Sequence, residues 1–63
     1  MKPYQERVVE ELKALEEKIL SLDAFIQTDD FKAIFQAERT RMERQLEVMH
    51  HYARILCWRI EGF

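Results

Sequence analysis

The sequence predicts an all-α protein: an antiparallel two-helix hairpin with a short helical corner, which assembles into a homo-oligomeric helical bundle. Two long stretches carry apolar residues at alternating steps of four and three. This spacing is typical of a helix that packs lengthwise on another helix. Because the two stretches have similar lengths and a short connection, an antiparallel hairpin is favoured. A chain of 63 residues is expected to form a single domain over residues 1–63.

The first helix is expected over about residues 4–27. Pro3 suits the first turn of a helix, and no glycine or proline follows before residue 28. The apolar seam of this helix consists of Val8, Leu12, Leu15, Ile19, Leu22 and Ile26. The Thr-Asp-Asp sequence at 28–30 breaks the pattern, and these side chains can cap a following helix. A turn is therefore expected at 28–30.

A second helix is expected over about residues 37–61, after a short helical corner at about 31–36. Its seam consists of Met42, Leu46, Met49, Ala53, Leu56 and Ile60. Gly62 stands where a helix terminator is expected, and Phe63 can fold back onto the end of the seam. A second apolar row, Val48, Tyr52 and Ile55, widens the apolar face beyond what one partner helix can cover.

The small size of the chain favours a homo-oligomer. A domain of this length buries only about 60% of the surface that its unfolded chain exposes, so a lone monomer would be marginally stable. The single cysteine, Cys57, cannot form an intrachain disulfide, and no paired Cys/His spacing indicates a structural zinc site. We therefore expect the second apolar row to be covered by another copy of the chain.

Nothing in the sequence indicates export or a membrane span. The longest unbroken apolar run, Ile55 to Trp58, has four residues, far fewer than a signal-peptide core or a transmembrane helix requires. The single cysteine fits a reducing compartment. We expect a soluble cytoplasmic protein without a membrane partner.

The net charge of −2 conceals two halves of opposite sign. Residues 1–30 carry four Lys/Arg and eight Asp/Glu, whereas residues 31–63 carry six and four. Opposite signs suit two segments that lie side by side. The chain lacks the large basic footprint of a duplex DNA binder, so we expect no duplex DNA partner.

A column of side chains beside each seam is predicted to pair across the hairpin. The predicted pairs are Tyr4 with Arg59, Glu11 with Tyr52, Lys18 with Gln45, and Phe25 with Glu38. A cation over a ring, a phenol with a carboxylate and an ammonium with an amide are plausible contacts for the first three pairs. One interpretation is a polar network that fixes the register of the helices. The functional interpretation is a groove for a small anionic or aromatic ligand, lined by Tyr4, Arg7, Lys18, Gln45, Tyr52 and Arg59.

Catalytic and metal-binding signals are weak. Glu47 and His50 form a Glu-x-x-His motif, which di-metal helical bundles use. The seam, however, places Glu47 on the outer face and His50 at its edge, while His50 and His51 point about 100° apart. Cys57 has no base at helical spacing, and a single glycine cannot form a phosphate-binding loop. We expect no enzyme activity, catalytic residue, cofactor or metal.

Trp58 is a candidate partner-binding residue. It falls on the helix face opposite the seam, four residues after Arg54, where a solvated helix normally carries lysine or glutamate. An exposed aromatic side chain beside an arginine is a common composition at protein interfaces. Arg54 and Trp58 therefore contact either a foreign protein or a neighbouring subunit of the same oligomer.

Residues along nearly the whole chain also carry a family resemblance. They are the opening Met-Lys-Pro-Tyr-Gln-Glu-Arg-Val-Val-Glu-Glu at 1–11, then Leu15, Lys18, Leu22, 24–26, Phe31, Gln45, Met49, Tyr52, Leu56, Arg59 and Ile60. With these residues the chain resembles a family of small helical proteins encoded by tailed bacteriophages and prophages. The resemblance implies a phage accessory protein that acts in the bacterial host cytoplasm, and it brings no catalytic residues.

Different classes of function follow from the resemblance. Small accessory proteins of phages are often antagonists of host defence, and some oligomers of helical hairpins act as sponges for cyclic nucleotide signals. By analogy of architecture, the first hypothesis is an oligomer whose groove sequesters such a signal. The second is a protein–protein inhibitor of a host defence or regulatory protein, comparable to an anti-CRISPR protein, which binds through Trp58. A virion or assembly accessory protein is a third hypothesis.

Overall fold

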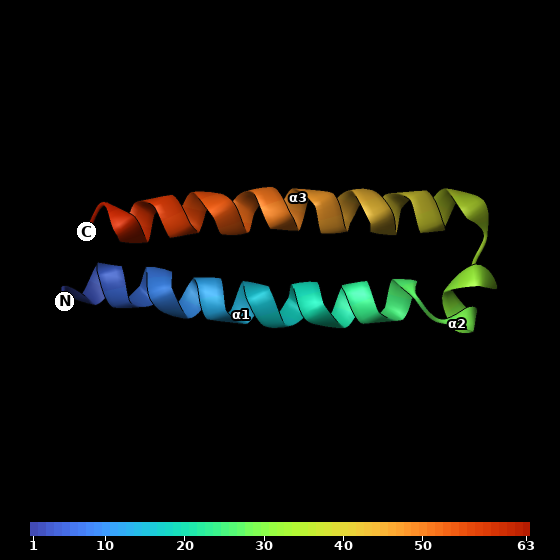
Figure 1. The fold of residues 1–63 in the computed structure, drawn as a ribbon, viewed down its shortest axis with the longest axis horizontal. Helices are drawn as coiled ribbons and strands as arrows, with labels where there is room; N and C mark the ends of the chain where they lie inside the picture. Colours follow the sequence, from blue (N-terminus) through green and yellow to red (C-terminus); the bar gives the residue numbers. More distant parts are fainter.

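The computed structural model describes residues 1–63 and is built from helices alone. They are α1 (Pro3–Ile26), α2 (Asp29–Lys32) and α3 (Gln36–Glu61). In Figure 1, α1 and α3 lie side by side and antiparallel, with both termini at one end and α2 at the other. The Cα atoms extend over 45 × 14 × 13 Å. The predicted all-helical chain with two long helices packed against each other is confirmed.

The seam residues of both long helices form the core. Val8, Leu15, Ile19 and Leu56 are buried together, and Leu56 is completely inaccessible to solvent. Partly buried residues that pack against this cluster are Leu12, Leu46, Met49, Ala53 and Ile60. Only five of the 63 residues are buried in all. A single layer of two helices leaves both of its broad faces exposed, so the core stays small.

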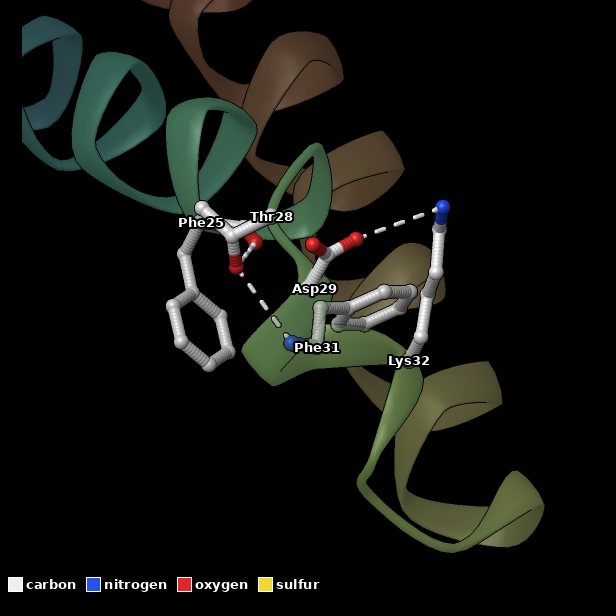
Figure 2. Close-up of polar contacts among 5 residues, drawn as sticks. All are labelled: Phe25, Thr28, Asp29, Phe31 and Lys32. Atoms are coloured by element: carbon white, nitrogen blue, oxygen red, sulfur yellow. Dashed lines mark hydrogen bonds and ion pairs between the residues drawn. The ribbon is translucent and has the colours of Figure 1, made fainter.

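The short helix begins earlier than the sequence predicted. Asp29 and Asp30 belong to the first turn of α2 rather than to a separate turn at 28–30, and the predicted corner at 31–36 is displaced accordingly. Thr28 is the reason, because its Oγ1 accepts a hydrogen bond from the Phe31 amide at 3.3 Å. The Thr28 hydroxyl also donates to the Phe25 carbonyl at 2.6 Å (Figure 2). One side chain thereby ends α1 and starts α2.

Two further contacts hold the corner. The rings of Phe25 and Phe31 meet edge to face with their centroids 6.2 Å apart, and Phe31 is buried. At the other side of α2, the Lys32 ammonium lies 3.6 Å from the Asp29 carboxylate (Figure 2). Both of these charged groups are exposed, so the ion pair contributes little to stability. The aromatic contact and the threonine cap therefore define the corner.

Replacing Thr28 with alanine is expected to lower the free energy of unfolding by about 1 kcal/mol while the hairpin is retained. The substitution removes the acceptor that the Phe31 amide uses at the start of α2. Urea denaturation followed by circular dichroism measures the change. Thr40→Ala is the matched control, because Thr40 is exposed within α3. Equal stability of the two variants would contradict the capping role.

The ends of α3 differ in detail from the expected pattern. Phe35 precedes the helix with an extended backbone and provides no side-chain cap. Gly62 ends the helix in the right-handed α region, so the helix stops without the left-handed conformation that glycine often supplies. Phe63 then packs edge to face on Tyr4, with the ring centroids 5.8 Å apart. This contact joins the two ends of the chain.

No helix has the apolar length needed to cross a membrane.

Candidate functional site

A hydrogen bond between the two long helices shows their relative position. The Tyr52 hydroxyl donates to the Glu11 carboxylate, so one of the four predicted pairs across the hairpin is present. The two residues are 41 positions apart in the sequence. Tyr52 and Glu11 therefore lie at the same height along the hairpin. Because α1 and α3 are antiparallel, a residue a given number of positions after Glu11 lies at the same height as the residue that number of positions before Tyr52. This register brings Lys18 to the same level as Gln45.

A groove opens beside the seam at that level. It is an open depression of about 440 Å³ and contains the second predicted pair, Lys18 and Gln45. The complete lining is Ala14, Glu17, Lys18, Ser21, Leu22, Gln45 and Met49. Its volume falls within the range of about 300–1,000 Å³ that is usual for small-molecule sites. The groove is therefore large enough for a small ligand.

The lining combines an apolar floor with polar walls. Leu22 and Met49 are seam residues and are only partly buried. Ala14 and Ser21 have small side chains and stand seven residues apart on the same face of α1, which leaves the space open. The Lys18 ammonium is the only cation of the lining and Glu17 is the only anion. In a single chain, the formal charge of the groove is therefore zero.

The remaining predicted ligand residues lie farther along the same flank. Tyr52 stands seven residues from Gln45, which is about 10 Å along the helix. Tyr4 and Arg59 stand a further seven residues along their helices, about 21 Å from the groove. Tyr4 also packs against Phe63. Five of the six predicted residues thus follow a line along the hairpin instead of enclosing one pocket, because a seven-residue column repeats about every 10 Å. Arg7 stands outside this column, three residues after Tyr4.

The predicted pair of Phe25 and Glu38 is replaced by other contacts. Phe25 packs on Phe31 at the corner. The Glu38 carboxylate accepts a hydrogen bond from the Arg41 guanidinium at 3.3 Å. The chain reverses through α2 at this end of the hairpin, and α2 supplies a closer aromatic partner for Phe25. Arg7 and Arg59 are exposed and take part in no ion pair.

Sequence reasoning did not identify a second, smaller groove. It lies at the contact of α1 and α3, has a volume of about 230 Å³ and is lined by Glu16, Ile19, Leu20, His50 and Ala53. Leu20 was the available signal, because it is a large apolar residue outside the seam and is 70% exposed. The first groove likewise contained the unrecognised residues Ala14, Glu17, Ser21, Leu22 and Met49. Four of them have small or seam-type side chains, and Glu17 is one of many exposed acidic residues of α1, so none carries an individual chemical signal.

The outer surface of α3 holds the predicted partner-binding residues. Trp58 is 61% exposed, and Arg54 is exposed one turn before it. Glu47, His51 and Cys57 are also exposed. Nowhere in residues 1–63 do three or more histidine, cysteine, aspartate or glutamate side chains gather as a metal site requires.

Comparison with known proteins gives one match. A family model described as Sequestin matches residues 2–62, nearly the complete chain. No curated protein matches the chain. No solved structure matches it either.

Proposed function

Because the chain belongs to the Sequestin family, we propose that it is a non-enzymatic protein that sequesters a small anionic signal of the cyclic nucleotide type. The family description is consistent with a sequestering role. The observation that carries the proposal is the groove in which Lys18 and Gln45 meet, next to an exposed tyrosine on the same flank. In this proposal the protein is a homo-oligomer encoded by a phage, and it antagonises a bacterial defence system in the host cytoplasm.

The groove, together with Tyr52 about 10 Å along α3 from Gln45, supplies the three kinds of contact that a cyclic nucleotide requires. The Lys18 ammonium can neutralise a phosphate, and the Gln45 amide can both donate and accept hydrogen bonds at a base or a ribose. The exposed Tyr52 ring offers a stacking surface for a base. The apolar floor of Leu22 and Met49 can contact the sugar and base. Each contact favours binding, and none alters a covalent bond.

The same lining supports a binding role in preference to a reaction. Ser21 is the only hydroxyl group in the groove, and its side chain makes no hydrogen bond to Glu17 or Lys18, the two ionisable groups of the lining. A serine needs an adjacent general base to become a nucleophile. We propose that a bound ligand is released chemically unchanged.

The proposal is tested by melting the purified protein with a panel of cyclic mononucleotides and cyclic dinucleotides. A ligand present at 100 times its dissociation constant stabilises the folded state by about 2.7 kcal/mol, so a binding ligand raises the melting temperature. Mass spectrometry of the ligand released by heating is expected to return the intact cyclic nucleotide. The absence of a melting shift with every compound, together with no nucleotide in the purified protein, would refute the sequestering function.

The exposure of Trp58 favours one alternative function. At 61% exposure beside Arg54, its indole can serve as the anchor of a contact with a host defence or regulatory protein. In this alternative, the chain inhibits its target by covering it, and the groove has no role. The two functions use different residues, so substitutions can separate them.

A further inference from the structure

A row of exposed apolar side chains runs along α3 on the same flank as the larger groove. Val48 is 66% exposed, Tyr52 is 42% exposed and Ile55 is 49% exposed. Met49, which adjoins this row on α3, contributes to the floor of the groove. The hairpin itself buries only five residues. The flank therefore presents an apolar surface that continues outward from the core.

The area that a dimer requires matches this flank. A standard protein interface buries about 800 Å² per partner, which is about a sixth of the 5,054 Å² exposed by this chain. The Cα atoms of the hairpin extend over 45 × 14 Å, and side chains widen this outline, so one broad face is of that order. A chain with so small a core gains stability from a partner that covers more apolar surface, and the partner always present at a matching concentration is a second copy. Covering the row with that copy extends the core across two chains.

We infer that a second copy docks face to face on this flank, with α3 of each copy lying against α1 of the other. The inference rests on the proposed function and deepens it, because it names the partner that closes the groove. The net charges of the whole helices favour this arrangement. From Pro3 to Ile26, α1 has six acidic and three basic residues, a net charge of −3. From Gln36 to Glu61, α3 has four acidic and five basic residues, a net charge of +1.

The alternative arrangement places like helices together. In it, the two α1 helices, each at −3, would lie against each other, and the two positively charged α3 helices would do the same. Like charges across an interface disfavour association. In the inferred arrangement, the two-fold axis runs parallel to the helices. Every two neighbouring helices are then antiparallel and have net charges of opposite sign. Antiparallel neighbours also place opposite helix-dipole ends together.

The same axis determines which residues meet. A rotation about this axis leaves every residue at the same height along the hairpin. The Tyr52–Glu11 hydrogen bond shows which residues of α1 and α3 share a height. Val48, one turn from Tyr52, is then level with Ala14, one turn from Glu11. The small Ala14 side chain lies in the groove lining and leaves space for Val48 of the second copy.

The second copy also changes the charge of the groove. Position 41 of α3 lies at the level of position 22 of α1, so Arg41 of the second copy comes level with Leu22 in the groove lining. In a single chain, Lys18 is offset by Glu17. The added guanidinium pairs with the Glu38 carboxylate of its own chain, a surface pair that is worth little, so a phosphate in the groove can take the place of that carboxylate and gain a second cationic contact beside Lys18.

The opposite flank is a weaker candidate. Leu20 is the large exposed apolar residue there, and it stands beside the charged Glu16 and the polar His50 in the smaller groove. Trp58 lies on the outer side of α3, away from the seam, and its neighbour Arg54 is charged. Apolar residues in a continuous row occur on the flank of Val48, Tyr52 and Ile55.

The experiment is a complementation between two variants, measured as mass in native mass spectrometry and light scattering. The wild-type chain is expected at twice its 7.7 kDa mass. Val48→Glu and Ala14→Lys each place an unpaired charge in the interface, so each alone is expected to weaken the dimer about 100-fold or more. An equal mixture of the two is expected to form a heterodimer, because the introduced carboxylate of one chain faces the introduced ammonium of the other. Isotopic labelling of one variant identifies that heterodimer.

Ala24→Lys is the matched control, since Ala24 is exposed on α1 outside the groove and this variant is expected to remain a dimer. A wild-type protein with the mass of a single chain would overturn the inference. So would a mixture that forms no heterodimer, whether or not the separate variants are folded. The measurement contains no ligand, so a dimer that binds no cyclic nucleotide would refute the proposed function and leave this inference intact.

Discussion

Replacing Leu56 with alanine is expected to lower the free energy of unfolding by about 2–5 kcal/mol, the usual cost of truncating a buried leucine. Leu56 is the only residue with no exposed surface, and it belongs to the same buried cluster as Val8, Leu15 and Ile19 of the opposite helix. A chain of 63 residues has a stability of about 3–9 kcal/mol at the usual value per residue. The substitution therefore removes a large part of the stability, and thermal melting followed by circular dichroism measures the loss.

Leu20→Ala is the matched control for this prediction. It removes the same atoms from α1, but Leu20 is 70% exposed. A surface substitution of this kind changes stability by about 0.5 kcal/mol or less. If both variants lost the same stability, the assignment of Leu56 to the buried core would be wrong. A loss confined to Leu56→Ala would locate the energetic centre of the hairpin in the seam.

Replacing Lys18 with glutamine is expected to weaken binding of a cyclic nucleotide by about 2–5 kcal/mol, while the helical content stays the same. Lys18 is the only cation that a single chain contributes to the groove lining, and loss of a charge that pairs with a phosphate costs several kcal/mol. Replacing Tyr52 with alanine is expected to remove base stacking worth about 1–3 kcal/mol. Isothermal titration calorimetry measures both losses, with the ligand that gives the largest melting shift.

Two controls isolate the role of the groove. Lys13→Gln removes the same charge from α1 at an exposed position outside the groove, and it is expected to bind as the wild type does. Tyr52→Phe retains the ring but loses the hydrogen bond to Glu11, so it is expected to retain stacking. If Lys13→Gln and Lys18→Gln weakened binding equally, the cause would be the overall charge of α1 and the assigned groove would be wrong.

A phage-protection assay with the same set separates the two proposed functions. If the groove is the functional site, Lys18→Gln and Tyr52→Ala lose the ability to protect a phage, whereas Trp58→Ala retains it. If the protein acts by covering a host protein, Trp58→Ala and Arg54→Gln are the inactive variants. The exposed indole would then be the anchor of the contact.

The helices and their pairing could be predicted from the sequence. Apolar side chains at steps of four and three are compatible with one solvent-shielded face of a helix and with no strand. The same spacing predicted the contact of Tyr52 with Glu11, because equal steps along two antiparallel seams keep flanking residues level. The limits of α1 and α3 lie within about one residue of those expected. Local periodicity was sufficient for each of these features.

The start of α2 and the shape of the groove were decided only in the tertiary structure. Thr28 bonds forward to Phe31 and backward to Phe25, and this double role depends on how the chain turns there. Periodicity shows which face of a helix a residue occupies, but not the space left between two facing side chains. The groove exists because Ala14 and Ser21 are small where Gln45 lies opposite, and it is about 21 Å from the aromatic contact at the chain ends. Packing in three dimensions determines such gaps. Of the residues predicted to line a ligand site, Lys18 and Gln45 therefore line the groove, whereas Tyr4, Tyr52 and Arg59 are separate exposed side chains.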